Sequence, residues 1–580
     1  MNSKDHSITE TALPTRRAAM IFRGKATLLQ VRRSVNDTIS GRSRKFEKAE
    51  RLSGTPILAN SVTPLWTESE PEERFLVAGK IENLRRAAKL LNGVEIPAGE
   101  VFSFWKHIGR ATRRRGFTVG REIREGCVIP NLGGGLCQLS NALYSSALTA
   151  GCEIVERHAH SRVIAGSLAE KDLDATVFWN YIDLRFRPRN DLRIEVSLDT
   201  NDLIVRFRGI RTDAQTSVKK PRRVLHESEP NSCATCGEGD CFRSIHPAEN
   251  KNKKRTAFLV DEYAAEFDEY ISAEKGRDDV LMLPIDGRRF RKANYAWRTD
   301  GFDRTKQSLP ITFLRSYRSR KLAAQGAERQ RNLLSMSERL ALDFARKLRP
   351  DMLHIVVQQN LLPHLWRNGD LGGRTFDVLM TALPMDALQK RLDLAYSQNP
   401  ESTTLGDFRA DQLLVQNESE ALAAAAKIIT PHSDIASLFP QRSVLLEWEM
   451  PSENLTDRPK NDKPTIVFPA TTVGRKGCYE LREAIRDMNI KLVLLGPVIE
   501  SPRFWEGFDV ERDRETSLFL ADLVVLPAYV EHRPQRLLKA AAAGVPVIAS
   551  SACGVENIDG IETIDVSELR HIGDLINKYI

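Results

Sequence analysis

The stretch ADLVVLPAYVEHRPQRLLKAAAAGVPVIAS, residues 521–550, decides the fold of the larger part of this chain. It begins with a short apolar run that ends at Pro527, continues through an Ala-rich helical stretch to Gly544, and closes on a second apolar run. Continuous apolar runs joined by helices are typical of parallel strands that are buried on both faces. The stretch therefore predicts a strand–helix–strand unit of a parallel sheet.

The same alternation of short apolar runs and helical stretches extends over the C-terminal half of the sequence. RTAFLVD, DDVLMLP, LHIVVQQ, TFDVLMTAL and AKIITPH precede a break with prolines at 451–464, and TIVFPA, IKLVLLG, ADLVVLPA and VPVIAS follow it. Two such series in succession predict two Rossmann-like lobes, residues 255–450 and 451–580, with a cleft between them.

A basic turn follows the first apolar run of the second lobe. Gly474 and Gly477 flank Arg475 and Lys476 where a helix is expected to begin. Backbone N–H groups at a helix start, together with two cations, are suited to a diphosphate.

These segments resemble the nucleotide-sugar lobe of the retaining GT-B glycosyltransferases, over residues 255–580 and most strongly over 464–556. The family pattern is a strand, a proline, a glutamate, seven residues and a second glutamate, followed by A-x-A-x-G-x-P-V. Glu531 matches the first glutamate. The resemblance implies an α/β fold, a nucleotide-sugar donor in the cleft, Arg475 and Lys476 on its diphosphate, and a glycan or glycolipid of the cell envelope as acceptor.

The sequence departs from this pattern at Lys539, which stands where the family has the glutamate that contacts the donor ribose. A lysine cannot accept the ribose hydroxyl hydrogens, although it could attract phosphate. The first lobe also carries the acidic stretch FLVDEYAAEFDEY in place of a glycine-rich loop. Two functions therefore stay open: an active transferase, or a glycan-binding scaffold with a degenerate transferase fold.

A second distinctive stretch, GGGLCQLSNALYSSAL at residues 133–148, leads three glycines into a cysteine-bearing helix. The first turn of a helix stabilises a thiolate, since its N–H groups are unpartnered and its dipole favours negative charge. The glycines would let the backbone approach whatever the Cys137 sulfur faces. The stretch fits a nucleophilic cysteine and a buried structural cysteine equally well.

With PAGEVFSFWKHIG, EIVERHAHS, DATV and DLRF, this stretch resembles the VanW family over residues 60–210. The helices and strands around it predict an α+β domain, residues 60–211. The chain order Cys137, His158 and His160, then Asp174 is that of papain-like thiol enzymes, with His160 the better candidate base because the family pattern carries a His there. The alternatives are a structural polar network of Arg157, His160 and Asp174, and a zinc site formed by Cys137 and the two histidines.

The segment 212–254 is predicted as a linker that carries three clustered cysteines, Cys233, Cys236 and Cys241. The C-x-x-C spacing lets two thiolates bind one ion, which predicts zinc with His226 or His246 as the fourth ligand. An iron–sulfur cluster would need a fourth cysteine, and a redox C-x-x-C would need a helix start after it. The absence of metal is the remaining alternative.

The first 59 residues form a basic arm, and residues 1–60 carry twelve Lys or Arg against five Asp or Glu. Residues 15–35 mix large apolar side chains with arginines, which is typical of a helix on an anionic membrane surface. The alternative is a helix packed on the next domain with a solvated basic face. Nucleic-acid binding is not expected, because no nucleic-acid-binding fold accompanies the charge.

The bulk composition fits a soluble multidomain protein of 580 residues, with 41% hydrophobic and 28% charged residues and a net charge of +8. Eight cysteines are too few for a disulfide framework in a chain this long, which favours a reducing cytoplasm. No run is apolar enough to cross a membrane, and no secretory signal is recognised.

Overall fold

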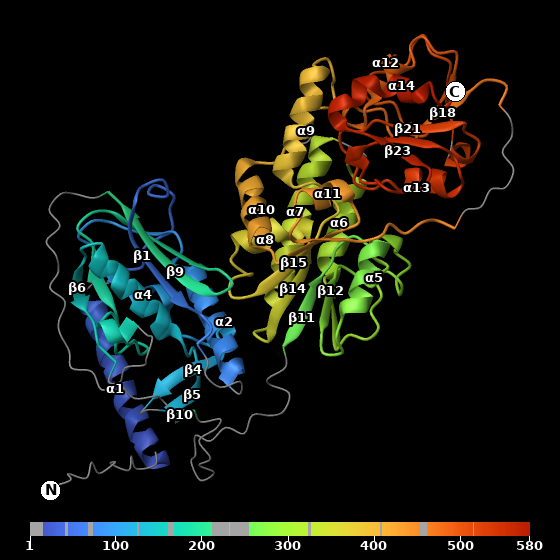
Figure 1. Cartoon of the computed structure of the whole chain (residues 1–580). Coiled ribbons are helices and arrows are strands. Elements are labelled where there is room, and N and C mark those ends of the chain that lie inside the picture. Colours follow the sequence, from blue (N-terminus) through green and yellow to red (C-terminus); the bar gives the residue numbers. More distant parts are fainter. Residues whose placement is uncertain are drawn as a thin grey trace, which may run out of the picture. The chain divides into compact units, whose positions relative to one another are not determined.

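The computed structural model describes residues 15–40, 44–67, 73–124, 127–160, 168–210, 231–232, 254–322, 326–406, 409–452, 461–513 and 515–580 (Figure 1). The chain divides into two compact units. The first unit comprises residues 1–254 with the short segments 349–353 and 368–374, and the second comprises the remainder.

The first unit is an α+β structure with three small sheets. A four-stranded antiparallel sheet has the order β1-β9-β8-β2. Two three-stranded sheets have the orders β10-β5-β4 and β3-β7-β6. The strand bounds are β1 Ile57–Pro64, β2 Val94–Ile96, β3 Phe102–Ser103, β4 Val119–Arg124, β5 Cys127–Leu132, β6 Glu153–Glu156, β7 Arg185–Arg187, β8 Leu192–Leu198, β9 Asp202–Gly209 and β10 Asn231–Ser232.

The helices of this unit are α1 Arg16–Ser40, α2 Arg74–Leu91, α3 Phe104–Ile108 and α4 Leu136–Thr149. Leu139 and Leu143 of α4 are fully buried with Leu84 of α2, as the helical spacing of the apolar residues predicts. Phe186 and Phe207 complete the same core from two of the sheets.

One expected strand is replaced by a turn. The alternation in TVFWNYIDLRFR, residues 176–187, predicts a continuous strand, but only Arg185–Arg187 is one. The chain turns at Phe178–Ile182, where Asn180 adopts a positive φ of 51°. Asparagine tolerates this left-handed conformation, which breaks the strand.

The first parallel sheet of the second unit has the order β13-β12-β11-β14-β15-β16-β17. Its strands are β11 Arg255–Leu259, β12 Val280–Leu283, β13 Arg304–Gln307, β14 Met352–Gln358, β15 Thr375–Leu379, β16 Lys427–Thr430 and β17 Ser443–Leu445. The helices between and after them are α5 Ala265–Glu274, α6 Leu309–Arg320, α7 Ala327–Lys347, α8 Leu362–Arg367, α9 Met385–Gln398, α10 Gln412–Ala424 and α11 Ser433–Ser437.

The second parallel sheet has the order β20-β19-β18-β21-β22-β23. Its strands are β18 Thr465–Phe468, β19 Lys491–Leu494, β20 Val510–Arg512, β21 Leu523–Leu526, β22 Val547–Ser550 and β23 Ile561–Ile564, and its helices are α12 Cys478–Ala484, α13 Gln535–Ala542 and α14 Ile572–Ile576. Every residue of β21 and β22 is buried, as expected for central parallel strands.

Each of these sheets has one point at which the strand order reverses. In the second sheet the chain starts at β18, adds β19 and β20 on one side, and then returns to add β21, β22 and β23 on the other. In the first sheet the same reversal lies between β11 and β14. Two Rossmann-like sheets in one unit confirm the expected GT-B-like fold class. Ligands of such sheets bind at the carboxyl ends of the strands beside this reversal.

Candidate functional site

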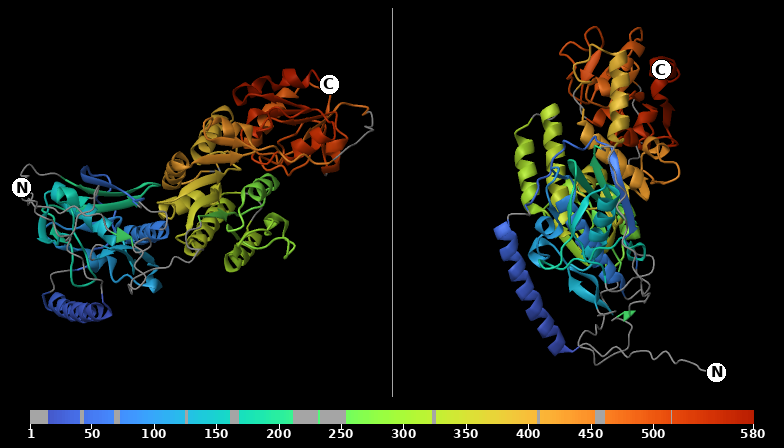
Figure 2. Two further views of the ribbon diagram at one scale, coloured as in Figure 1. Left: turned by 60° about the horizontal axis from the view of Figure 1, so that its bottom comes forward. Right: turned by 90° about the vertical axis from the view of Figure 1, so that its left-hand side faces the viewer.

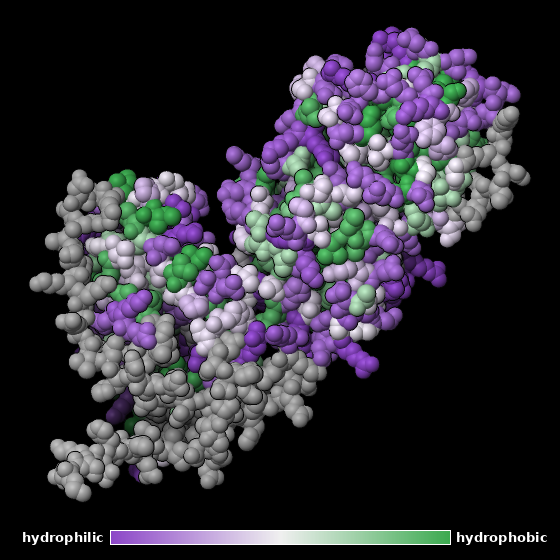
Figure 3. Space-filling view, in the orientation of Figure 1, coloured by the Kyte–Doolittle hydropathy of each residue, from purple (hydrophilic) through white to green (hydrophobic). Residues whose placement is uncertain are grey.

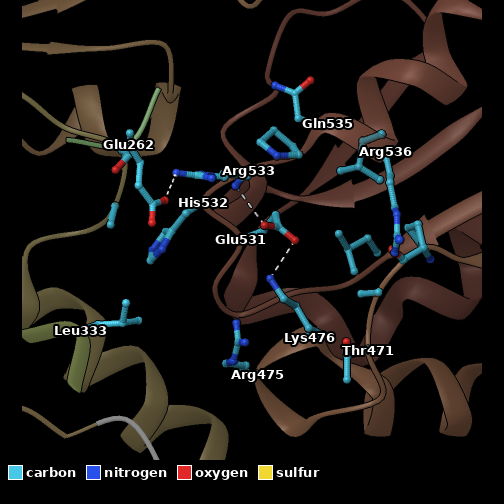
Figure 4. Close-up of a pocket in the computed structure, with 17 residues that line it drawn as sticks. Glu262, Leu333, Thr471, Arg475, Lys476, Glu531, His532, Arg533, Gln535 and Arg536 are labelled. Carbon is cyan, nitrogen blue, oxygen red and sulfur yellow. Dashed lines mark hydrogen bonds and ion pairs between the residues drawn. The ribbon is translucent and has the colours of Figure 1, made fainter. Parts of the chain in front are cut away.

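A pocket of about 720 Å³ in the second unit lies at the carboxyl ends of strands from both parallel sheets. Residues 469–471 of its wall directly follow β18, and Leu526 ends β21. From the other lobe, Glu262 follows β11, and residues 381–382 follow β15. The carboxyl ends of strands from both sheets therefore meet at one cavity, lined by Glu262 and Leu333 on one side and by residues of the second lobe on the other (Figure 4).

Four basic side chains line this pocket, namely Arg475, Lys476, Arg533 and Arg536, against two carboxylates, Glu262 and Glu531. The Arg536 guanidinium donates to the Pro469 carbonyl at 2.7 Å. This contact ties the start of α13 to the end of β18. The excess of positive charge makes the pocket suited to an anionic ligand.

Lys476 and Glu531, both singled out in the sequence, form an ion pair in the pocket wall. Lys476 Nζ lies 2.7 Å from Glu531 Oε2 and donates to the Val530 carbonyl at 2.9 Å. Burial lowers the pKa of Lys476. Burial would raise the pKa of Glu531, but the nearby lysine charge leaves it lowered. Arg475 lies beside Lys476 in Figure 4, and burial lowers the pKa of its guanidinium.

The turn that carries Arg475 and Lys476 differs from the expected helix start. Residues Gly474–Lys476 form a 3-10 turn, and α12 begins only at Cys478. The Gly474 N–H donates to Glu500 Oε1 at 2.6 Å and to Thr404 Oγ1 at 3.0 Å. That N–H is therefore committed to the protein.

Glu500 is a functional candidate that sequence reasoning missed. Besides Gly474, it accepts hydrogen bonds from Ser402 Oγ at 2.8 Å, Tyr479 OH at 3.1 Å and the Thr403 N–H at 3.1 Å. Burial would raise the pKa of Glu500, but hydrogen bonds from the Thr404 and Ser402 hydroxyls and from the Gly474 and Thr403 N–H groups leave it lowered. The carboxylate thus fixes the Gly474 turn from one side. No local pattern marks it, because its partners are distant in sequence.

Lys539 is not among the residues that line the pocket. It lies in the second turn of α13, whose first residues do line it. His532 and Arg533 are pocket residues that the sequence did not single out. His532 Nε2 accepts the Leu383 N–H at 3.3 Å, and burial holds its pKa well below 6.5. Arg533 Nη2 donates to Glu262 Oε2 at 2.7 Å (Figure 4).

One residue of the acidic stretch after β11, Asp261, forms buried contacts within the first lobe. Asp261 is 1% exposed and pairs with Arg315 Nη1 at 2.5 Å, and the Asn360 amide donates to it at 2.7 Å. Burial raises the pKa of Asp261. Only the next residue, Glu262, is among the residues that line the pocket.

In the first unit, Cys137 lies in the first turn of α4, as expected. Its sulfur is 3.9 Å from both Thr176 Oγ1 and the Val177 carbonyl oxygen. The Asn141 side chain accepts the Ala175 N–H at 2.8 Å, and Ser140 Oγ donates to the Ala175 carbonyl at 2.5 Å. These bonds fix the start of α4 against residues 175–177.

His160 and Asp174 are brought to this cysteine by loops rather than by strands. His160 follows β6, and its Nδ1 lies 2.8 Å from Asp174 Oδ2, which also accepts the His160 backbone N–H at 2.6 Å. Arg157 Nη2 donates to the other Asp174 oxygen at 2.8 Å. With Nδ1 turned to Asp174, the other ring nitrogen is left for the hydrogen bond with Cys137.

The electrostatics of these residues favour a charged thiolate–imidazolium pair. Burial would raise the pKa of Cys137, but the hydrogen bond and the charge of His160 leave it lowered. Burial would lower the pKa of His160, but Asp174 and Cys137 raise it to about 10. Burial would raise the pKa of Asp174, but bonds to His160 and the charge of Arg157 leave it lowered.

The family comparison concerns this part of the chain. Residues 79–208 match the family model described as VanW like protein. Residues 79–208 form a VanW-like domain. The chain is 35% identical over 133 residues to the vancomycin B-type resistance protein VanW of Enterococcus faecalis, and 33% identical over 105 residues to YoaR of Bacillus subtilis. These matches span 22% and 18% of this chain, and 47% and 34% of the relatives, so less than half of each relative is covered.

Two solved structures are similar to the other part of the chain. The sucrose-phosphate synthase of Thermosynechococcus elongatus is 14% identical with a TM-score of 0.37, over 56% of this chain and 89% of that one. A UDP-forming α,α-trehalose-phosphate synthase of Burkholderia xenovorans is 10% identical with a TM-score of 0.32, over 56% and 92%.

The side chain of His158, which the sequence also singles out, pairs with Glu156 instead of Cys137. His158 is half exposed, and its Nε2 lies 3.4 Å from Glu156. The backbone carbonyl of His158 accepts the Thr176 N–H at 2.7 Å and so helps to hold the segment that contacts Cys137. Among the residues that the structure describes, no three His, Cys, Asp or Glu side chains gather as a metal site.

The three glycines before Cys137 approach other parts of the VanW-like domain and not the sulfur. A Cβ at Gly134 would lie 2.5 Å from the Gly120 carbonyl oxygen of β4. A Cβ at Gly135, whose φ is 97°, would lie 2.1 Å from the Lys80 side chain of α2. The glycines therefore allow close packing of the α4 start on α2 and β4.

The predicted zinc ligands Cys233, Cys236 and Cys241 lie outside the described residues. The zinc site and its iron–sulfur alternative therefore stay predictions.

No helix in the described part of the chain combines the length and the apolar character needed to cross a bilayer.

Proposed function

We propose that this chain transfers a sugar from a nucleotide-sugar donor to a glycan or glycolipid acceptor of the cell envelope. The observation that carries the proposal is the basic pocket at the carboxyl ends of β18 and β21, beside the reversal of strand order. Two parallel sheets opening onto one cavity provide a donor side and an acceptor side. The family resemblance of the segment around Glu531 points to the same chemistry.

For this reaction the pocket must stabilise a departing nucleoside diphosphate. When the bond between the anomeric carbon and the phosphate oxygen breaks, negative charge grows on the diphosphate. Arg475 and Arg536 line the cavity, and a guanidinium group presents several N–H donors to phosphate oxygens. Fixed cations at the place where charge develops lower the barrier without reorganisation.

His532 is suited to orient a sugar hydroxyl. Its pKa well below 6.5 keeps the ring neutral, and its Nε2 is used as an acceptor by the Leu383 N–H. The proton of a neutral ring then sits on Nδ1, which can donate one hydrogen bond. We further propose that the anomeric configuration is retained, following the resemblance at Glu531.

The donor site is tested by calorimetry with nucleoside diphosphates and the matching nucleosides. Arg475→Gln removes one charge-assisted phosphate contact, and we expect about 10- to 100-fold weaker binding of the diphosphate, with little change for the nucleoside. Arg503→Gln, an exposed arginine of the same lobe, is the matched control. Equal affinities for the diphosphate in the three proteins would remove the assignment.

Turnover separates the transferase from the non-catalytic scaffold. A panel of nucleotide sugars is incubated with the full chain and a mixture of envelope glycans, and release of nucleoside diphosphate is followed. Glycan-dependent release supports the transferase, and NMR of the product anomer tests retention. Donor binding with no release under any acceptor would favour the scaffold, in which Lys539 replaces a glutamate that the active family uses.

A second function is favoured by the arrangement of Cys137, His160 and Asp174. We propose that the thiolate attacks an acyl carbonyl to form a thioester, while the His160 imidazolium gives its proton to the leaving amine or alcohol. Water then hydrolyses the thioester, and His160 recovers a proton as the thiolate is restored. Asp174 and Arg157 hold the ring in place throughout.

Trapping tests this second function directly. An activated ester offered to the full chain should acylate Cys137, as read by peptide mass spectrometry, and Cys137→Ser should lose the label. Cys127→Ser is the control, because Cys127 is a free, partly exposed cysteine of the same unit. Labelling that falls equally on Cys127 and Cys137 would exclude a dedicated nucleophile.

A further inference from the structure

Helix α1 is anchored to the first unit along one face. Phe22 packs edge-on against Phe178 with ring centroids 5.8 Å apart, and the Asn180 amide donates to the Gln30 carbonyl at 3.1 Å. Further along, Arg33 pairs with Glu156. In both views of Figure 2 the helix lies along the outside of this unit. The contacts fix which side of α1 faces the protein.

The opposite face of α1 is apolar and exposed. Large apolar residues there have exposed fractions between 50% and 80%, namely Met20, Ile21, Leu28, Val31, Val35 and Ile39. At about 100° per residue, these six fall within an arc of about 100°. The centre of the arc lies about 180° from that of the anchored residues. We call these six residues the apolar stripe.

Cations border the apolar stripe on both sides. Arg16 and Arg23 flank one edge, and Lys25 and Arg32 flank the other. Arg17 lies within the arc of the stripe at the N-terminal end of the helix, and all five cations are exposed. No carboxylate among the described residues forms an ion pair with any of them. The single acidic residue of α1, Asp37, lies on the anchored face and pairs with Arg185.

This concentration of exposed apolar side chains is unlike the rest of the described surface. Eight of the twenty-five exposed large apolar residues lie in α1. On the face of the second unit seen in Figure 3, hydrophilic residues predominate, and apolar residues form scattered patches. A stripe this continuous marks an interaction site.

We propose that the apolar stripe of α1 docks the chain on the surface of an anionic lipid bilayer. The stripe would enter the boundary between headgroups and acyl chains, and Arg16, Arg23, Lys25 and Arg32 would contact the lipid phosphates. The helix lies in the plane of the surface and does not cross it.

Charge favours a bilayer over a second copy of the chain as the occupant. Two copies joined through their stripes would bring the flanking cations of both helices together, with no acidic residue on either exposed face to offset them. An anionic lipid surface instead supplies a counter-charge for every cation. The proposal goes beyond the sugar transfer proposed above, and its test does not depend on activity.

The test is co-sedimentation of the full chain with phosphatidylcholine vesicles, with and without phosphatidylglycerol. We expect binding to the anionic vesicles that weakens as salt is raised. Leu28→Glu with Val35→Glu should reduce this binding about tenfold or more, since it places charge in the stripe. Lys25→Gln with Arg32→Gln should reduce it by about fivefold for each cation.

Controls carry the same substitutions elsewhere. Leu413→Glu with Leu394→Glu changes two leucines of α10 and α9 that are 57% and 40% exposed, and Arg277→Gln with Lys427→Gln removes two exposed cations of the second unit. These variants should bind as the parent does. Equal binding of all variants, or a concentration-dependent dimer that Leu28→Glu with Val35→Glu abolishes without any vesicle binding, would overturn the proposal. Unchanged thermal unfolding shows that the variants fold.

Discussion

His160 Nδ1 and Asp174 Oδ2 are separated by 2.8 Å, with the backbone N–H of the same histidine on the same oxygen. This contact raises the pKa of His160 from 6.5 to about 10, together with Cys137 and against burial. The charged imidazole therefore contributes stability that is present in full below pH 6.5 and is lost as the pH rises through about 10. At neutral pH the histidine is a cation beside the sulfur.

The first prediction concerns the reactivity of Cys137 with iodoacetamide as a function of pH. Because its pKa is lowered, the thiolate persists below the ordinary thiol pKa of 9.0. Burial raises the pKa of Cys152 to about 12, so that cysteine serves as an internal control. At pH 7, mass spectrometry should find Cys137 alkylated about a hundredfold faster than Cys152.

Variants of the partner residues test the cause of this reactivity. His160→Ala removes the cation and should move the pH midpoint of Cys137 alkylation upward. Asp174→Asn should move it in the same direction by a smaller amount, since the ring remains but loses its counter-charge. A midpoint that stays unchanged in both variants would show that Cys137 and His160 are not coupled.

The chain order of Cys137, His160 and Asp174 sufficed to predict that they belong together, but not how they meet. His158 and His160 lie in the same short segment of sequence. The course of the chain after β6 places His160 beside Asp174 and His158 beside Glu156. Arg157 donates to the second oxygen of Asp174, whereas the sequence alone indicates it only as a member of the alternative polar network. Loop geometry of this kind has no periodic signal in a sequence.

The second prediction concerns the packing role of the glycine run. Gly134→Ala would place a Cβ 2.5 Å from the Gly120 carbonyl oxygen, so that α4 or β4 must shift. We expect a loss of about 1–3 kcal/mol in the free energy of unfolding, measured by denaturant titration of the full chain. Gly54→Ala is the matched control, because a Cβ there has nothing within 4 Å. Equal effects of the two substitutions would refute the close packing.

The two parallel sheets show which part of a fold a sequence reveals. The central strands, such as β21 and β22, are continuous apolar runs and were predicted. The strands β13, with the sequence RTKQ, and β20, with the sequence VER, were missed. Both lie at the edge of a sheet, where one side faces no partner strand and polar residues are tolerated. Their membership depends on pairing with distant strands and not on local composition.

The third prediction concerns the cysteine cluster of residues 233–241. Three thiolates at this spacing favour a bound zinc ion, and elemental analysis of protein prepared under reducing conditions should find about one zinc per chain. Cys233→Ser or Cys236→Ser should lose the metal, whereas Cys127→Ser should keep it. Iron in place of zinc would favour the cluster alternative, and the absence of both metals would remove the metal site.

The last prediction separates the roles of Lys476 and Arg475 in the pocket. Lys476 Nζ lies 2.7 Å from Glu531 Oε2, and their side chains are only 11% and 14% exposed. Lys476→Met leaves Glu531 buried without its counter-charge, and we expect a loss of about 3–5 kcal/mol in the free energy of unfolding. Lys476→Met with Glu531→Gln removes both charges and should recover most of that loss. If the pair is structural, the double variant should still bind a nucleoside diphosphate through Arg475. The contrary outcome is a double variant that recovers none of the free energy of unfolding lost in Lys476→Met and shows no binding by calorimetry. Lys476 then contacts the ligand itself, as the sequence alone predicts.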